Sequence, residues 1–143
     1  MSKPVLIAMM GLPRSGKSTI SRRLSKDLGA PIVNRDSIRL ALHGQRYQIE
    51  AEPMVKAMSL YMIKALFGVG HEVVICDETN YSKAAREALK SDKWETRFFP
   101  VLTNPDICKD RAVDTGQSDL IKIISEMELR YEPLGPEDLI YGY

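Results

Sequence analysis

The chain has 143 residues, of which 44% are hydrophobic and 27% charged, with a formal net charge of +1. This composition is typical of an ordinary globular domain, and no apolar run reaches the length of a membrane-spanning helix. The near-neutral charge supplies no strong attraction to nucleic acid or to a membrane, so it neither requires nor excludes a polynucleotide partner.

The length predicts a single domain over residues 1–143, because such a chain can bury a core without covalent links. Cys76 and Cys108 match neither a metal-binding nor a redox spacing. They are best interpreted as small core residues in a reducing cytoplasm. We therefore expect a cytoplasmic location and no membrane partner, while the oligomeric state stays open.

Apolar runs typical of buried strands alternate with apolar stripes at helical spacing. This alternation predicts an α/β fold with a mainly parallel sheet that is flanked by helices on both faces. The expected strands are residues 5–10, 31–33, 71–77, 97–102 and a short one within 138–143. The expected helices run from Ser18 to Gly29, from Asp36 to a polar loop around Gly44-Gln45-Arg46, over 51–67, from Ser82 to about Lys90, from Asn104 to about Asp114, and from Ser118 or Asp119 to Pro133.

Two details of this pattern predict how elements pack. Met54, Met58, Tyr61, Met62 and Ala65 recur at helical spacing, so we expect them to face the sheet, with the lining of an acceptor groove as the alternative. Within the fourth strand a proline, residue 100, predicts an edge position or a bulge, since proline cannot donate to a strand ladder.

Residues 11–18 read Gly-Leu-Pro-Arg-Ser-Gly-Lys-Ser, which is a complete phosphate-binding loop. A buried strand precedes this loop and a helix follows it, as the motif requires. Backbone N–H groups would wrap the phosphates of ATP, Lys17 would reach the β- and γ-phosphates, and the hydroxyl of Ser18 would hold Mg²⁺. The predicted ATP-binding residues are Gly11, Leu12, Pro13, Arg14, Ser15, Gly16, Lys17, Ser18, Thr19 and Arg111.

Two further strand ends carry polar side chains, in residues 34–39 and 77–80. Ligands of an open parallel sheet bind at this edge, and carboxylates beside a phosphate loop suit phosphoryl transfer. Asp36 is the candidate general base, with a plain helix cap as the alternative interpretation. Asp77 is the candidate metal anchor together with Ser18, and Glu78 is its rival.

Several other side chains are candidates for binding substrate or offsetting charge. Arg39 lies three residues after Asp36, so both face the same side of a helix and Arg39 can grip an acceptor phosphate. Arg111 precedes a polar break, residues 114–117, that would serve as a lid, and it is a better candidate than Arg14 for a catalytic cation. Thr79 and Asn80 are predicted to bind substrate, or else to form a turn.

Together these motifs resemble the phage-type 5′-hydroxyl polynucleotide kinase domain, within the wider group of small P-loop kinases. The resemblance rests on Gly11-x-Pro13-x-Ser15-Gly16-Lys17-Ser18-Thr19, Asn34-Arg35-Asp36-x-x-Arg39 and Asp77-x-Thr79-Asn80. It implies transfer of the γ-phosphate of ATP to a hydroxyl, with the residue matching Asp36 as general base and the residue matching Arg39 on the acceptor's phosphate. It also implies single-stranded or end-exposed nucleic acid as a partner and, for a phage-encoded chain, the host cytoplasm. The family's lid normally carries an arginine pair, whereas this chain offers only Arg111 there.

Two other functions stay open at this point. Related small P-loop kinases act on sugar acids and other small alcohols, and the near-neutral charge favours such an acceptor. A nucleotide-binding module with slow or no hydrolysis would need Lys17 and Ser18, but it has no reason to require Asp36 and Arg39.

Overall fold

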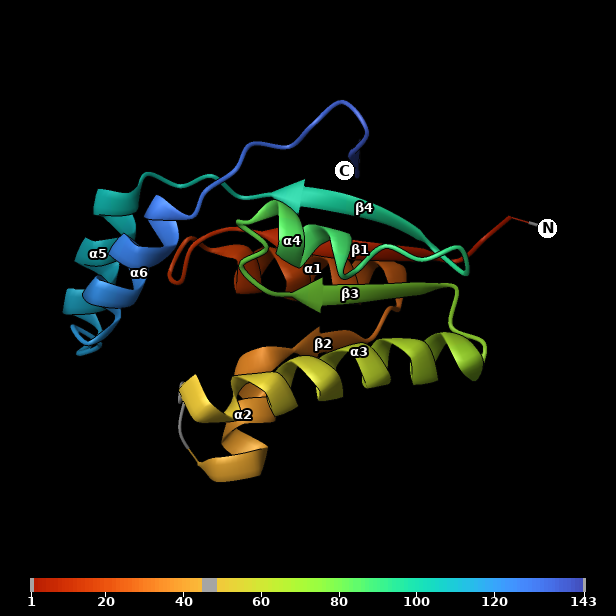
Figure 1. Cartoon of the computed structure of the whole chain (residues 1–143), viewed down its shortest axis with the longest axis horizontal. Helices are drawn as coiled ribbons and strands as arrows, with labels where there is room; N and C mark the ends of the chain where they lie inside the picture. The colour runs from red at the N-terminus through yellow and green to blue at the C-terminus, as the bar shows by residue number, and fades with distance from the viewer. Residues whose placement is uncertain (1, 45–48, 143) are drawn as a thin grey trace.

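The computed structural model describes residues 2–44 and 49–142, and its centre is a five-stranded sheet in the order β2-β3-β1-β4-β5. Strands β1 to β4 are labelled in Figure 1. Every neighbouring pair of strands is parallel, which confirms the predicted α/β architecture. The strands are β1 (Val5–Met10), β2 (Ile32–Asn34), β3 (Val73–Asp77), β4 (Glu95–Pro100) and β5 (Leu139–Ile140).

The helices follow the predicted order and fall close to the predicted limits. They are α1 (Lys17–Leu28), α2 (Arg35–His43), the 3₁₀ turn η1 (Ile49–Ala51), α3 (Glu52–Gly68), α4 (Lys83–Glu87), α5 (Pro105–Asp114) and α6 (Leu120–Leu129). Ser82 and Asn104, the predicted starting residues of two helices, cap α4 and α5 through their side chains. Residues 45 and 46 of the predicted polar loop lie outside the described residues. In the described ranges, no helix combines the length and apolar character that a membrane crossing needs.

The core lies on both faces of the central strand β1. Leu6 and Ala8 pack on the face that α3 covers, whereas Ile7 and Met9 pack against Leu24 of α1 on the other face. Because successive side chains of a strand point to opposite faces, the continuous apolar run of β1 suits a strand that is covered on both sides. Both cysteines are buried, as expected.

The predicted core stripe of α3 is confirmed at Met58 and Met62 but is wrong at its other three positions. Met54 and Tyr61 are 57% and 68% exposed, and Ala65 is exposed too, whereas Val55, Ser59 and Ile63 are buried. Met58 and Met62 are partly buried and pack against the core. The apolar residues of α3 occur on several of its sides, so their spacing alone does not define which stripe meets the sheet.

The interpretation of Pro100 also needs correction. It is the last residue of β4, which pairs with β1 on one side and β5 on the other, so β4 is not an edge strand. A proline is tolerated at this position because the ladder ends there. The short strand expected in the tail forms as β5 and extends the sheet beyond β4.

A fully buried arginine connects the loop after β3 to the segment after α6. Arg86 donates from Nη1 to the carbonyl oxygens of Asn80 and Tyr81, and from Nη2 to the carbonyl of Pro133. The rings of Tyr81 and Tyr131 pack beside this connection with centroids 4.9 Å apart. These contacts fix α6, which lies with α5 beyond the arrowheads of β3 and β4 in Figure 1.

Arg86→Met should lower the free energy of unfolding by about 3 kcal/mol, because it removes three buried hydrogen bonds to carbonyl oxygens, at roughly 1 kcal/mol each. Urea denaturation followed by circular dichroism measures this change. Arg23→Met, on the exposed face of α1, is the control and should change stability by less than about 0.5 kcal/mol. Equal stability of the two variants would show that the carbonyls find other partners.

Candidate nucleotide and acceptor site

A cleft of about 1140 Å³ opens at the carboxyl ends of β1, β2 and β3. Its walls come from the phosphate loop, α2, the start of α3, the loop after β3, α5 and α6. The predicted site residues that line it are Pro13, Arg14, Gly16, Lys17, Ser18, Thr19, Asp36, Arg39, Asp77, Thr79, Asn80 and Arg111. The other predicted loop residues do not line the cleft but are buried beneath it, where they hold the loop in shape; these are Gly11, Leu12 and Ser15.

The phosphate loop connects β1 to α1 and is shaped by two residues with left-handed backbone conformation. Arg14 has φ 66° and Gly16 has φ 98°. Turns of this kind direct successive N–H groups into one concavity, and the N-terminus of the following helix adds positive potential. Gly11 is required for a different reason, because a Cβ there would lie 2.7 Å from Oγ of Ser15 and 2.8 Å from the carbonyl oxygen of Val101.

Lys17 is held within the loop, where its Nζ donates to the carbonyl of Leu12 at 3.3 Å. Burial lowers the pKa of Lys17, while the nearby carboxylates of Asp77 and then Asp36 act in the opposite direction. The lysine is therefore a partly desolvated cation between two carboxylates. Anionic phosphate oxygens would replace the solvation that burial removes.

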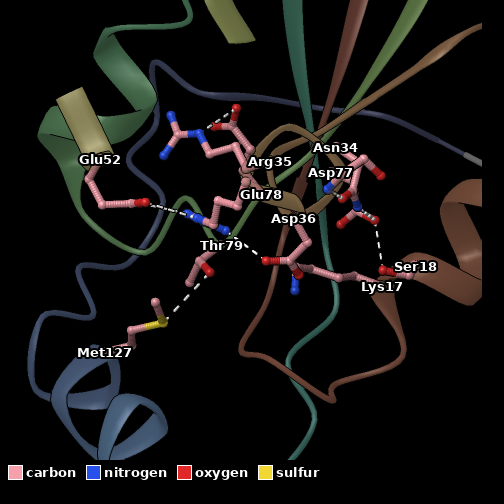
Figure 2. A network of polar contacts seen from close by, with 12 residues as sticks. Lys17, Ser18, Asn34, Arg35, Asp36, Glu52, Asp77, Glu78, Thr79 and Met127 are labelled. Carbon is pink, nitrogen blue, oxygen red and sulfur yellow. Dashed lines mark hydrogen bonds and ion pairs between the residues drawn. The ribbon is translucent and has the colours of Figure 1, made fainter. Parts of the chain in front are cut away.

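Ser18 and Asp77, the predicted metal pair, are in direct contact. Oδ2 of Asp77 accepts from Oγ of Ser18 at 2.7 Å, from Nδ2 of Asn34 at 3.0 Å and from Oγ of Ser21 at 3.4 Å. Figure 2 shows Ser18, Asn34 and Asp77 together on one side of the cleft, opposite Glu52. A hydroxyl and a carboxylate are oxygen donors of the kind Mg²⁺ prefers, so these residues fit that ion.

Glu78, the rival metal anchor, is engaged elsewhere. Its side chain is 2% exposed, forms an ion pair with Nε of Arg35 at 2.9 Å, and accepts from Oγ of Ser59 at 2.6 Å. Since consecutive residues at a strand end point to opposite sides, Glu78 faces α3 where Asp77 faces Ser18. This geometry favours Asp77 as the anchor.

The cap of α2 is Asn34, so the interpretation of Asp36 as the helix cap is wrong. The side chain of Asn34 accepts from the N–H of Ser37 at 2.9 Å, and its extended backbone continues β2 up to the first helical residue. Asp36 consequently lies in the first turn, and its side chain is 62% exposed at the cleft. Its carboxylate remains accessible to a ligand.

Arg39 does point toward Asp36, as its spacing predicts, but it also has a partner that the sequence does not reveal. Its Nη1 donates to Asp36 at 2.8 Å, while Nη2 and Nε donate to the two carboxylate oxygens of Glu52 at 2.6 and 2.9 Å. Burial opposes the charged form, yet hydrogen bonds and charges from Glu52 and then Asp36 raise the pKa of Arg39. Arg39 is therefore a permanent cation held between two helices.

Thr79 and Asn80 differ in their contacts. Nδ2 of Asn80 donates to the carbonyl of Met9 at 2.7 Å, and its φ of 51° is typical of an asparagine in a turn. The hydroxyl of Thr79 lies 3.7 Å from Sδ of Met127, a residue of the α6 wall. Substrate binding by these two residues stays a prediction.

Arg111 lies over the phosphate loop. Its Nη1 donates to the carbonyl of Arg14 at 3.1 Å, although the two residues are far apart in the sequence. The predicted polar break follows α5 directly, and Gln117 within it lines the cleft. Sequence spacing did not indicate the wall that α6 contributes, which is formed by Leu120, Ile123, Met127 and the residue that follows the helix, Arg130.

Asn34→Asp should lower the free energy of unfolding by about 1–3 kcal/mol, because it replaces a donor to Asp77 with a second carboxylate. The new residue can still cap α2, so the loss reports the contact with Asp77. Asn104→Asp is the matched control, since Asn104 is an exposed cap of α5. Urea denaturation at pH 7 should show a difference between the two variants, and equal stabilities would contradict the proposed contact.

Comparison with solved structures finds the same fold in several proteins. A gluconokinase from Sinorhizobium meliloti 1021 superposes with a TM-score of 0.67 at 18% identity, over 98% of this chain and 82% of the other. A protein from Chloroflexus aurantiacus j-10-fl, provisionally described as a kinase, has a TM-score of 0.74 at 15% identity over 98% and 84% of the two chains. At these identities the similarity concerns the fold alone.

A chain of the Pnkp1/Rnl/Hen1 RNA repair complex also matches, with a TM-score of 0.67 at 19% identity. All of the present chain is covered, but it spans only 53% of that longer chain. Comparison with curated proteins finds no match. Residues 6–118 match the family AAA_33, described as an AAA domain. The chain therefore belongs to this AAA domain family, and its fold is that of a P-loop kinase.

Proposed function

We propose that the protein transfers the γ-phosphate of ATP to a hydroxyl group, with a polynucleotide 5′-hydroxyl as the first candidate acceptor. The position of Asp36 is the observation that carries this proposal. Its accessible carboxylate lines the same cleft as Lys17 and the Ser18–Asp77 pair, and it does not serve as a helix cap. A module that only binds nucleotide has no use for such a carboxylate.

In the proposed reaction the acceptor oxygen forms a bond to the γ-phosphorus while the bond to the β–γ bridging oxygen breaks. Asp36 would accept the proton of the attacking hydroxyl. Lys17 and Arg111 would offset the charge that develops on the transferred group and on the leaving diphosphate. Ser18 and Asp77 would hold Mg²⁺, which supplies further neutralisation of the phosphates when bound.

The two candidate acceptors have different support. The motif with Asp36 and Arg39 resembles that of polynucleotide kinases, and the fold matches a chain of an RNA repair complex. A small polyhydroxy alcohol is the second candidate, because the net charge is only +1 and two carboxylates surround Arg39. The fold of gluconokinase is equally similar.

Asp36→Asn should reduce the rate of transfer by about 10²–10⁴-fold, because it removes the proton acceptor but leaves the phosphate loop intact. Each variant is incubated with ATP labelled at the γ-phosphate and with separate pools of 5′-hydroxyl oligonucleotides and small alcohols, and the label that appears in each pool is measured. Asp106→Asn is a matched control, since Asp106 is an exposed carboxylate in the first turn of α5. Lys17→Ala tests the donor side and should abolish transfer to either pool.

Two results would count against the proposal. Transfer to neither pool, with ATP still bound, would favour the non-catalytic nucleotide-binding alternative. Full activity of Asp36→Asn would move the general base to another carboxylate of the cleft. If oligonucleotides are the acceptors, their affinity should also fall with added salt, because phosphate contacts release counterions.

A further inference from the structure

The acceptor end of the cleft contains a cation whose charge is already matched. All three nitrogens of the Arg39 guanidinium donate to carboxylates, one to Asp36 and two to Glu52. Arg39, Asp36 and Glu52 together therefore carry a formal charge of −1. An anionic group that approaches Arg39 meets a net negative cluster and not an isolated cation.

The contact with Glu52 is the stronger of the two by geometry. It is bidentate, which is the arrangement in which arginine and carboxylate pair most strongly. The Arg39 and Glu52 side chains are only 13% and 21% exposed, whereas Asp36 is 62% exposed. Solvent therefore screens the Glu52 contact less than the Asp36 contact.

The location of Glu52 stabilises its carboxylate further. Glu52 is the first residue of α3, and a helix N-terminus favours negative charge. The preceding residue, Ala51, provides no side-chain cap for this helix. Glu52 is thus an anion of the protein itself. It occupies the two nitrogens of Arg39, Nε and Nη2, that an anionic group of the acceptor would have to contact.

We propose that Glu52 is a specificity-determining residue, which competes with an anionic group of the acceptor for Arg39. In this arrangement Glu52 sets how strongly the cleft prefers phosphate-bearing alcohols over neutral ones. A phosphate beside the reacting hydroxyl must displace Glu52 or bind against its charge, whereas a neutral alcohol leaves the pair intact. This inference rests on the proposed function in one respect, since it assumes that an alcohol occupies the cleft beside Asp36.

The test compares two probes that differ by one phosphate, thymidine and thymidine 3′-monophosphate. Their binding is measured by calorimetry with the nucleotide site saturated by a non-hydrolysable ATP analogue. Glu52→Gln should bind the 3′-monophosphate at least about tenfold more tightly than the wild-type protein does, because it removes a like charge while keeping the side-chain volume. The affinity for thymidine should change less than twofold.

Two controls separate this effect from a general change of charge or stability. Glu50→Gln removes an exposed carboxylate two residues away, in η1, and should leave both affinities unchanged. In an Arg39→Gln background, Glu52→Gln should give a much smaller gain, because the competition needs the guanidinium and only the repulsion between like charges is then relieved. Circular dichroism checks that each variant is folded, and Glu52→Ala should reproduce the gain if Glu52→Gln is unstable.

An unchanged or weaker affinity of folded Glu52 variants for the 3′-monophosphate would overturn the inference, and so would failure of both probes to bind any variant. Because the assay measures binding, its outcome is independent of phosphoryl transfer. If the proposed function is wrong, every variant will bind the probes but none will transfer phosphate to them. If only the role of Glu52 is wrong, the wild-type protein and the Glu52 variants will all transfer phosphate, and all will show the same preference for phosphate-bearing acceptors.

Discussion

One carboxylate oxygen, Oδ2 of Asp77, connects the end of β3 to the end of β2 and to the start of α1. It accepts from Ser18 at the start of α1, from Asn34 at the end of β2 and from Ser21 one turn further along α1. Asn34 in turn caps the helix that carries Asp36 and Arg39. Beyond the strand ladders themselves, the side-chain contacts between the phosphate loop and the acceptor end of the cleft therefore converge on a single anion, itself 5% exposed. A proposed Mg²⁺ ligand would then also be the main structural connection between the donor and acceptor halves.

The donor half could be predicted from the sequence because its determinants are local. The phosphate loop, the apolar run of β1 and the caps Ser82 and Asn104 each depend on residues close together in the chain. The pairing of Ser18 with Asp77 could also be anticipated, since parallel strands end at a common edge. Local chemistry of this kind leaves few alternatives.

The acceptor half could not be predicted to the same extent, because its contacts are tertiary. No spacing rule connects Arg39 with Glu52, which meet only when α2 packs on α3. The buried stripe of α3 was predicted only in part for a related reason, since apolar residues occur on several sides of this helix. Arg86 likewise acquires its role from the carbonyl of Pro133, 47 residues later. Each of these features concerns how helices meet, and not which segments are helical.

The position of β1 in the sheet has a kinetic consequence. This strand comes first in the chain, yet its partners are β3, in register from Val73, and β4, in register from Glu95. Central pairing of such high sequence separation slows folding, because a long loop must close before any ladder forms. The phosphate loop directly follows β1, so its position becomes fixed only when β3 and β4 have paired with that strand. A nucleotide would therefore bind only chains whose sheet is complete, and by mass action it would stabilise that folded state. Binding would come late in folding, after the long-range strand pairs have formed.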